Sequence, residues 1–519
     1  MRIWLSLVIL AACGSDPDPL TIDLDSGTIH GEGSGDIREF LGIPYAAPPV
    51  GDFRFRAPQP VTPWTTTMET VAFGPECPQS LSLSGVSNTE DCLYLNVWAP
   101  QGASNMPVMV WLHGGAFILG SGGDKYYDGS NLASQGVIVV SLNYRLGLFG
   151  FLANSAFAND DPDYPTIGNY GLEDQRAALQ WVQRNIEKFG GDPKHVTLFG
   201  ESAGGMSVCI HYLSSRTAGL FDRAISESGL CSSPLLEVQS NIAATEGDMI
   251  ATSLGCADHD ATTVDCLRGK TADELLAVTK LPAPTDPPGG PIYQPFLLPG
   301  SLPVVDGYVI EQPLAAAVKA GNFQPRPLIL GNVADEGTLF HSPLFAQPVT
   351  DDASYRAALG NRFDAALIDG IVGHYPVDAY PTPNRTLAQV TGDAFFKCPS
   401  RVFAAAVTTA GAALYRYQWE TEMTNPLFTD LGVFHSSEIP FVFGNDDYPL
   451  GQIGPATDMA TAIQAYWIAF AKTANPNVTG QLAWPLYDST NPQIEFSSPL
   501  KVGTHLDDDA CVFWTQEVN

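Results

Sequence analysis

The chain has 519 residues, of which 45% are hydrophobic and only 16% carry a charge. Acidic residues outnumber basic ones by 56 to 25, and the resulting net charge of −31 repels nucleic acid, which we exclude as a partner. The length exceeds the usual size of one core. Even so, an α/β enzyme of this length can form one compact unit when insertions extend a central sheet.

The N-terminus resembles an export signal. Arg2 is followed by the apolar run Ile3 to Ala12, which is too short to span a bilayer. The run ends in Leu10-Ala11-Ala12-Cys13, which resembles a bacterial lipobox, so residues 1–12 would be the signal peptide and Cys13 the lipidated residue. The alternative is an ordinary secretory signal that happens to end near a cysteine. Either signal predicts an exported protein, whose membrane contact would be limited to a lipid anchor.

Two continuous apolar runs predict buried strands of a parallel sheet, Val108 to Leu112 and Val137 to Leu142. The first run leads directly into His113-Gly114-Gly115-Ala116-Phe117. Glycines in such a loop free backbone N–H groups to point into a site. A tight turn would explain this segment on its own, but its place ahead of the next motif favours an anion-stabilising loop.

A strand-turn-helix motif follows a predicted helix. Apolar residues recur at helical spacing from Gly171 to Phe189, two glycines end that helix, and Val196 to Phe199 predicts a strand. The next residues, Gly200-Glu201-Ser202-Ala203-Gly204, fit the G-x-S-x-G pattern of a nucleophile elbow. Ser202 would stand at the carboxyl end of a strand, where open α/β sheets bind ligands. We therefore predict that Ser202 is the nucleophile of a serine hydrolase.

A serine nucleophile needs a base and an acid, which follow it along the chain in this fold class. The strand-like Leu328 to Leu330 leads into a loop with two adjacent carboxylates, Asp335 and Glu336. The residues alone do not choose between these two. Both would be solvated if the loop were only a surface turn.

The base is sought among the histidines that follow the acid. His341 lies too close to the acidic loop, which leaves His374, His435 and His505. His435 follows the predicted strand Ala413 to Tyr417 through a long loop, so it is the first choice, and His505 is the second. For the oxyanion of the tetrahedral intermediate, we expect the donors to be the N–H groups of Gly115, Ala116 and Ala203.

The other cysteines support export. None forms a C-x-x-C pair, so a zinc site is not indicated, and no metal or organic cofactor is expected. Cys77 with Cys92, and Cys256 with Cys266, lie close enough in sequence to staple loops, and Cys398 with Cys511 would close a longer one. Cys209 and Cys231 are interpreted as buried free thiols in a helix and after a strand.

Taken together, these motifs identify the chain as similar to the type-B carboxylesterase and lipase family, which includes the cholinesterases. The matching segments extend from about Gly42 to the C-terminal region: EDCLYLNVWAP, HGGAF, NYRLG, GNYGLEDQRAALQWV, GESAGG, DEG, GVFHSSEIPFVFG and FAKTANPN. The resemblance implies an α/β-hydrolase fold over residues 13–519, with a mostly parallel sheet and helices on both faces. It also implies that Glu336 is the acid and His435 the base, that Glu201, Ser228 and Glu438 form a network behind them, and that the three cysteine pairs are disulfides.

Two departures from the family bear on the substrate. Ala116 replaces the third glycine of the oxyanion loop but keeps its N–H, and the segment from Cys77 to Cys92 lacks the tryptophan that holds choline in cholinesterases. We therefore expect a carboxylesterase for short- to medium-chain esters, with a small-molecule ester as its partner. The alternatives are a lipase for long-chain lipid esters and a non-catalytic adhesion module, whose relatives usually lose a member of the triad. Residues Leu281 to Gly300 predict a long surface loop whose path cannot be read from spacing.

Overall fold

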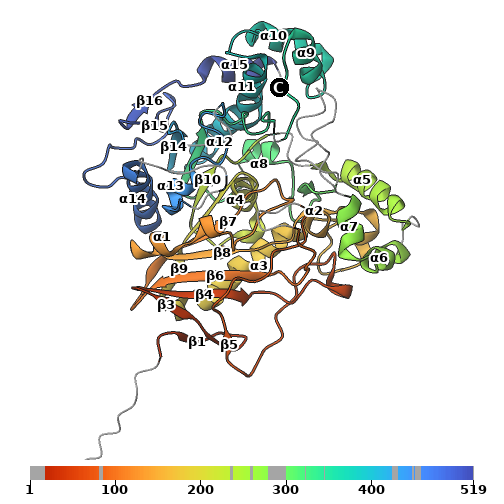
Figure 1. Ribbon diagram of the computed structural model, residues 1–519, viewed down its shortest axis with the longest axis vertical. Coiled ribbons are helices and arrows are strands. Elements are labelled where there is room, and N and C mark those ends of the chain that lie inside the picture. Colours follow the sequence, from red (N-terminus) through yellow and green to blue (C-terminus); the bar gives the residue numbers. More distant parts are fainter. Residues whose placement is uncertain are drawn as a thin grey trace, which may run out of the picture.

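The protein is built around a mixed sheet of eleven strands (Figure 1). The computed structural model describes residues 18–517, apart from 81–85, 234–237, 257–260, 279–299, 322, 344, 424–429, 447–448 and 450–456. In spatial order the strands are β16 (Lys501–Gly503), β15 (Gln493–Phe496), β14 (Leu414–Trp419), β13 (Leu328–Val333), β10 (Arg223–Glu227), β9 (Gly191–Glu201), β7 (Met106–Leu112), β8 (Ile138–Leu142), β6 (Tyr94–Pro100), β4 (Ile37–Pro44) and β3 (Glu32–Ser34). From β15 to β8 all neighbours run parallel, whereas the pairs at both edges are antiparallel. This arrangement confirms the predicted α/β-hydrolase sheet.

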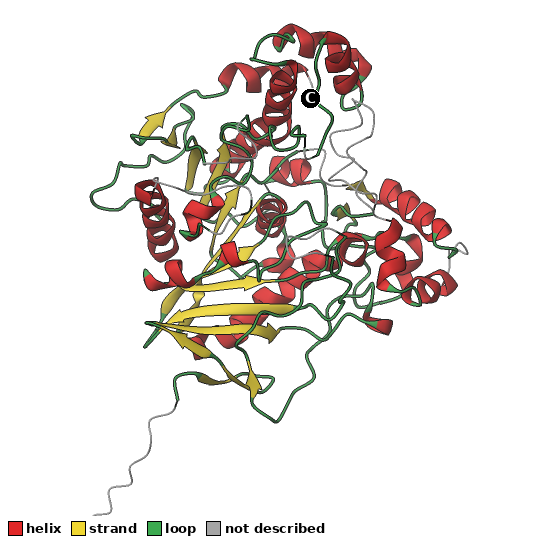
Figure 2. Cartoon of the chain, in the orientation of Figure 1, coloured by secondary structure: helices red, strands yellow, loops and turns green. Residues whose placement is uncertain are grey.

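Helices cover both faces of the sheet (Figure 2). On one face, Val110 and Leu198 pack in the same cluster as α3 (Tyr170–Asn185), α4 (Ala203–Leu213) and α12 (Cys398–Thr409). On the other face, Met109 and Phe199 pack with α1 (Ser130–Ser134), α13 (Ile439–Phe443) and α14 (Thr457–Thr473). Alternate residues of one strand point to opposite faces, so strands buried on both sides are apolar throughout. This is why the apolar runs of the sequence predicted central strands.

The remaining strands and α-helices lie around this core. They are β1 (Thr21–Asp23), β2 (Thr28–His30), β5 (Met68–Glu69), β11 (Val238–Gln239), β12 (Val304–Val305), α2 (Gly147–Phe151), α5 (Ser240–Ser253), α6 (Ala261–Arg268), α7 (Ala272–Val278), α8 (Leu314–Ala320), α9 (Asp352–Gly360), α10 (Ile368–His374), α11 (Pro383–Thr391) and α15 (Asp508–Glu517). A π-helix, η7 (Gly392–Lys397), joins α11 to α12. None of the helices in the described part of the chain is long and apolar enough to cross a membrane.

Most predicted elements are present with small shifts at their ends. The helix predicted from Gly171 to Phe189 is α3, which ends at Asn185 and tightens into a 3-10 turn over Ile186–Phe189. The strand predicted from Val196 begins earlier, because β9 already pairs with β7 at Gly191. The N-terminal signal and residues 281–299 of the predicted loop lie outside the described residues.

The described residues contain four disulfides, and one of them corrects a prediction. Cys77–Cys92, Cys256–Cys266 and Cys398–Cys511 are bonded as predicted. Cys209 and Cys231 are buried as expected, but they are bonded to each other rather than free, so that prediction was wrong. Helix α4 packs on β10 and brings the two Cα atoms to 5.5 Å, within the range of a disulfide. Local periodicity showed that each residue is buried, but not which residue faces it.

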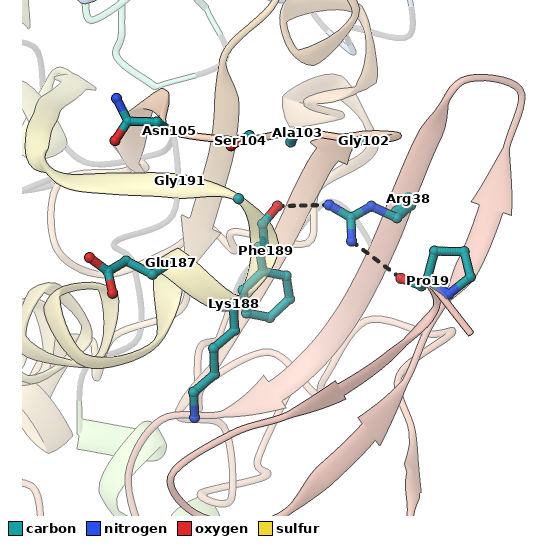
Figure 3. A pocket seen from close by; sticks show the side chains of 11 residues that line it. Pro19, Arg38, Gly102, Ala103, Ser104, Asn105, Glu187, Lys188, Phe189 and Gly191 are labelled. Atoms are coloured by element: carbon teal, nitrogen blue, oxygen red, sulfur yellow. Dashed lines mark hydrogen bonds between the residues drawn. The ribbon is translucent and has the colours of Figure 1, made fainter. Parts of the chain in front are cut away.

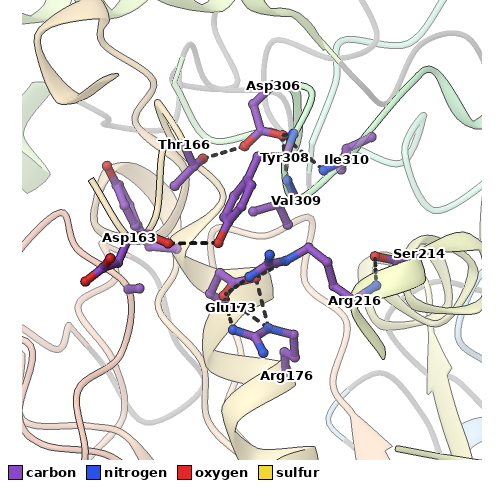
Figure 4. Close-up of polar contacts among 12 residues, drawn as sticks. Asp163, Thr166, Glu173, Arg176, Ser214, Arg216, Asp306, Tyr308, Val309 and Ile310 are labelled. Carbon is purple, nitrogen blue, oxygen red and sulfur yellow. Dashed lines mark hydrogen bonds and ion pairs between the residues drawn. The ribbon is translucent and has the colours of Figure 1, made fainter. Parts of the chain in front are cut away.

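Two polar clusters hold outlying segments against α3 and the turn that follows it. Arg38 of β4 donates to the carbonyls of Phe189 and Pro19 beside a surface cavity of about 440 Å³ (Figure 3). In Figure 4, Glu173 of α3 accepts hydrogen bonds from Arg176 and Arg216. The Arg216 guanidinium lies 3.9 Å from the Tyr308 ring centroid, which fastens the segment after β12 to α3. Neither cluster contains a predicted site residue.

Candidate active site

Ser202 stands at a sharp turn between β9 and α4. Its backbone has φ 56° and ψ −121°, a sparsely populated conformation for a residue with a side chain, and its side chain is half-buried. The turn depends on close backbone contacts. A Cβ on Gly200 would lie 2.6 Å from the Leu112 carbonyl oxygen, and one on Gly204 would overlap the same oxygen. The glycines of the motif are therefore required by the approach of β7 to the turn, as a nucleophile elbow demands.

The acidic loop after β13 places its two carboxylates in different surroundings. Glu336 is fully buried, and its Oε1 accepts hydrogen bonds from the Asn332 side chain at 3.0 Å and the Val333 N–H at 3.1 Å. Its Oε2 lies 2.6 Å from His435 Nδ1. Asp335 instead pairs with Arg385 at 3.0 Å. Of these two carboxylates only Glu336 contacts His435, so the structure distinguishes two residues that spacing could not.

His435 lies in a buried aromatic setting, with its Nδ1 on Glu336. The ring centroids of Phe340 and Phe396 are each 5.0 Å from that of the imidazole. The other candidate bases lie elsewhere: His374 stacks on Phe513, and His505 is exposed and pairs with Asp508. Sequence reasoning missed both aromatic neighbours. Phe396, for example, belongs to the π-helix η7, and nothing in its local sequence indicates that it contacts His435.

The second imidazole nitrogen faces the elbow. His435 Nε2 is 3.2 Å from Glu201 Oε1, and Glu201 immediately precedes Ser202. Among the described residues, Nε2 has no hydrogen-bond partner. The same Glu201 oxygen accepts a hydrogen bond of 2.6 Å from Ser436, the residue after His435. The elbow and the histidine loop are thus in direct contact, although Ser202 Oγ and Nε2 form no hydrogen bond here.

The glycine loop after β7 lies beside the elbow. Gly115 and Ala116 have φ 100° and 54°, and a Cβ on Gly114 would lie 3.1 Å from the Ser202 Cβ. The imidazole of His113 stacks on Tyr144 with ring centroids 4.4 Å apart, and it contacts the Gly114 carbonyl. Burial lowers the pKa of His113 to about 4, so this histidine is neutral at physiological pH and acts as a rigid support for the loop.

Further carboxyl groups are buried behind the elbow. Ser228 Oγ donates to Glu438 Oε1 at 3.4 Å, and Glu201 accepts the hydrogen bond from Ser436 beside the histidine. Burial raises the pKa of Glu201 well above its usual range, and the nearby Glu438 carboxyl raises it further. Burial and the Glu227 carboxyl do the same to the pKa of Glu438.

Glu227 is a member of this cluster that sequence reasoning missed. Its Oε1 accepts a hydrogen bond of 2.8 Å from the Trp467 indole. Complete burial raises the pKa of Glu227 to about 8, and the indole N–H offsets part of that rise. The only signal in the sequence was its position at the end of an apolar strand, directly before Ser228.

The raised pKa of Glu227 predicts a pH-dependent stability. The folded protein keeps a proton on Glu227 that the unfolded chain loses above its ordinary pKa of 4.5, so this contribution is present below pH 4.5 and is lost as pH rises through about 8. Between pH 5 and 8 we expect the free energy of unfolding of Glu227→Gln to fall less steeply than that of the wild type, by up to about 1.4 kcal/mol per pH unit, and its Tm to fall less accordingly. The exposed Glu69→Gln serves as control. If Tm fell equally with pH in the wild type and in Glu227→Gln, the expectation would be contradicted.

Comparison with known proteins identifies the family of this chain. The profile of the carboxylesterase family matches residues 18–514. The para-nitrobenzyl esterase of Bacillus subtilis is 39% identical over 478 residues, covering 89% of this chain and 91% of the relative. A solved structure of PNB esterase superposes with a TM-score of 0.82 at 35% identity, covering 96% of this chain and 100% of that one.

Two further relatives differ in their named substrates. The acetylcholinesterase of Bungarus fasciatus is 34% identical, covering 98% of this chain and 89% of the relative. The fumonisin B1 esterase of Sphingopyxis macrogoltabida is also 34% identical, covering 96% of this chain and 90% of the relative. Coverage of nearly the whole chain by the family profile and by these enzymes means that the protein belongs to the carboxylesterase family and is a carboxylic ester hydrolase.

Proposed function

We propose that Ser202, His435 and Glu336 form the catalytic triad of a serine carboxylesterase. The observation that carries the proposal is the 2.6 Å contact between Glu336 Oε2 and His435 Nδ1, in a buried site where His435 Nε2 lies 3.2 Å from Glu201, the residue before Ser202. The acid holds the imidazole so that Nε2 is left to accept a proton. The Ser202 hydrogen bond to Nε2 forms with substrate, since such bonds commonly tighten only in the complex.

The reaction proceeds through an acyl-enzyme. Ser202 Oγ attacks the ester carbonyl as its proton passes to His435 Nε2, and the N–H groups of Gly115, Ala116 and Ala203 stabilise the oxyanion. The C–O bond to the alcohol then breaks, and His435 returns the proton to the departing alcohol. Water, deprotonated by the same histidine, attacks the acyl carbon, and breakage of the Ser202 ester bond releases the acid and restores the hydroxyl.

The substrates are esters of short- to medium-chain acids. The similarity to para-nitrobenzyl esterase supports a small ester, and the aromatic rings of Phe340 and Phe396 lie beside His435. A preference for choline esters is disfavoured despite the similarity to an acetylcholinesterase. The segment from Cys77 to Cys92 contains no tryptophan to hold a quaternary ammonium group.

A graded ester series tests this specificity. We expect kcat/KM on p-nitrophenyl esters to be highest for acyl chains of about two to eight carbons and to fall steeply towards palmitate, because a confined pocket gains about 0.8 kcal/mol per CH₂ only while the chain fits. Butyrylthiocholine should be a poorer substrate than the neutral butyrate ester. Preference for the choline ester, or a rise in rate when triglyceride forms an emulsion, would favour a cholinesterase or a lipase instead.

The non-catalytic alternative gives a distinct outcome. An adhesion module of this fold would show no turnover and no labelling of Ser202 by a phosphonate ester. A labelled Ser202, detected by mass spectrometry as a phosphonate adduct on its peptide, would exclude that alternative. Retention of Ser202, Glu336 and His435 favours the enzyme, since non-catalytic relatives usually lose one of them.

We also propose that the protein is exported and attached to the bacterial envelope through lipidated Cys13. The signal-like sequence of residues 1–12 supports this, and four disulfides suit an oxidising compartment. Mass spectrometry of the mature protein is expected to find a diacylglyceryl group on Cys13. A mature chain that still begins at Met1 would overturn the proposal, and an unlipidated N-terminus would favour simple secretion.

A further inference from the structure

Asp335 is the carboxylate of the acidic loop that does not contact His435. It contacts instead the loop that carries His435. The backbone N–H of Asp335 donates to the Val433 carbonyl, and the Val433 N–H donates to Asp335 Oδ2, both at 2.9 Å. Asp335 also forms a parallel bridge with Phe434, the residue before His435. The acid-bearing segment and the base-bearing segment are therefore joined side by side, one residue away from the Glu336–His435 contact.

Arg385 closes this junction from a third element, α11. Its guanidinium donates to Asp335 Oδ1 at 3.0 Å and to the carbonyls of Asp430 and Leu431 at 3.0 and 3.1 Å. One rigid, planar group thus binds both segments at once, which a flexible ammonium group does less well. The Asp335 and Arg385 side chains are 23% and 29% exposed, so their pairing is only partly screened by water.

The shape of the histidine loop fits around the Asp335 side chain. Gly432 has φ 63°, and a Cβ there would overlap Asp335 Oδ2. Thr338 adds a second link, since its hydroxyl bridges the carbonyls of Asp335 at 2.8 Å and Leu431 at 2.7 Å. The Asp335 carboxylate is thereby fixed by the loop on one side and by Arg385 on the other.

We propose that Asp335 and Arg385 are positioning residues that hold the His435 loop against Glu336 during catalysis. This inference rests on the proposed role of His435 as the base. Neither residue touches the reacting atoms. They set the relative position of the acid and the base, and a misplacement of about 1 Å in a catalytic group costs on the order of 100-fold in rate.

The test measures kcat and KM separately for p-nitrophenyl butyrate in Arg385→Ala and Asp335→Asn. We expect kcat to fall about 10- to 100-fold in Arg385→Ala, with KM changed less than about twofold, because substrate contacts are intact. Arg385→Lys should recover part of kcat. The double variant should be no slower than its slower parent, since both changes break one junction.

Controls separate this inference from its alternatives. Arg356→Ala removes an exposed ion pair of α9 with Asp352 and Asp369, and it should leave both constants unchanged. A lowered Tm with wild-type kcat in Arg385→Ala would assign a purely structural role and overturn the inference. Full activity of His435→Ala would overturn the proposed function, whereas an inactive His435→Ala beside a fully active Arg385→Ala would refute the positioning role alone.

Discussion

Ser202→Ala is expected to lower the hydrolysis of p-nitrophenyl butyrate by at least about 10,000-fold, while the thermal unfolding curve stays close to that of the wild type. Alanine removes the nucleophile, so no acyl-enzyme forms. It also leaves the elbow intact, because the strained φ and ψ at this position are imposed by β9 and α4 rather than by the hydroxyl. The residual rate should be that of an oxyanion site without a nucleophile.

Two further variants show whether the loss of activity is due to the missing nucleophile: a control at an exposed serine and a variant of the proposed base. Ser134→Ala alters an exposed hydroxyl at the end of α1 and should retain full activity. His435→Ala should lose a similar factor, and Ser202→Ala combined with His435→Ala should lose little more, because triad residues act as a unit. Wild-type turnover by Ser202→Ala in steady-state assays would refute the assignment of the nucleophile.

Gly204→Ala is expected to destabilise the protein by about 3 kcal/mol or more and to abolish activity. A methyl group at this position would overlap the carbonyl oxygen of Leu112 and crowd its carbonyl carbon, both of which belong to the backbone of β7. A backbone neighbour cannot rotate away, so α4 would have to move off the sheet together with the elbow. The higher helix propensity of alanine offsets only about 1 kcal/mol of this cost.

A second glycine separates crowding from a general effect of alanine. Gly360 ends α9 with no heavy atom within 4 Å of a Cβ built there, so Gly360→Ala should be neutral or slightly stabilising. Thermal unfolding of both variants, with soluble yield as a second measure, provides the comparison. Equal stability of Gly204→Ala and wild type would show that the elbow does not need close contact with β7.

Much of the site could be predicted from local sequence because its parts are encoded locally. Gly200 and Gly204 are required within a single turn, and the glycine loop directly follows β7. Short sequence motifs are therefore enough to locate both the elbow and the loop. The three predicted disulfides were supported by the family resemblance as well as by spacing. The Cys209–Cys231 bond lacked such support and was missed, since it depends on the packing of α4 against β10.

The central strands and the position of Ser202 at the end of one of them were predicted from the sequence alone, because apolar runs and glycine turns are determined by residues close to each other in the chain. Spacing did not choose between Asp335 and Glu336, which are chemically similar neighbours on one loop; the family resemblance implied Glu336, and the tertiary structure gives the physical reason. Their roles diverge because successive side chains point in different directions: Glu336 turns inward to His435, whereas Asp335 turns to Arg385. The contact partners lie 99 and 50 residues away along the chain, and no local pattern records which distant residue a side chain will face.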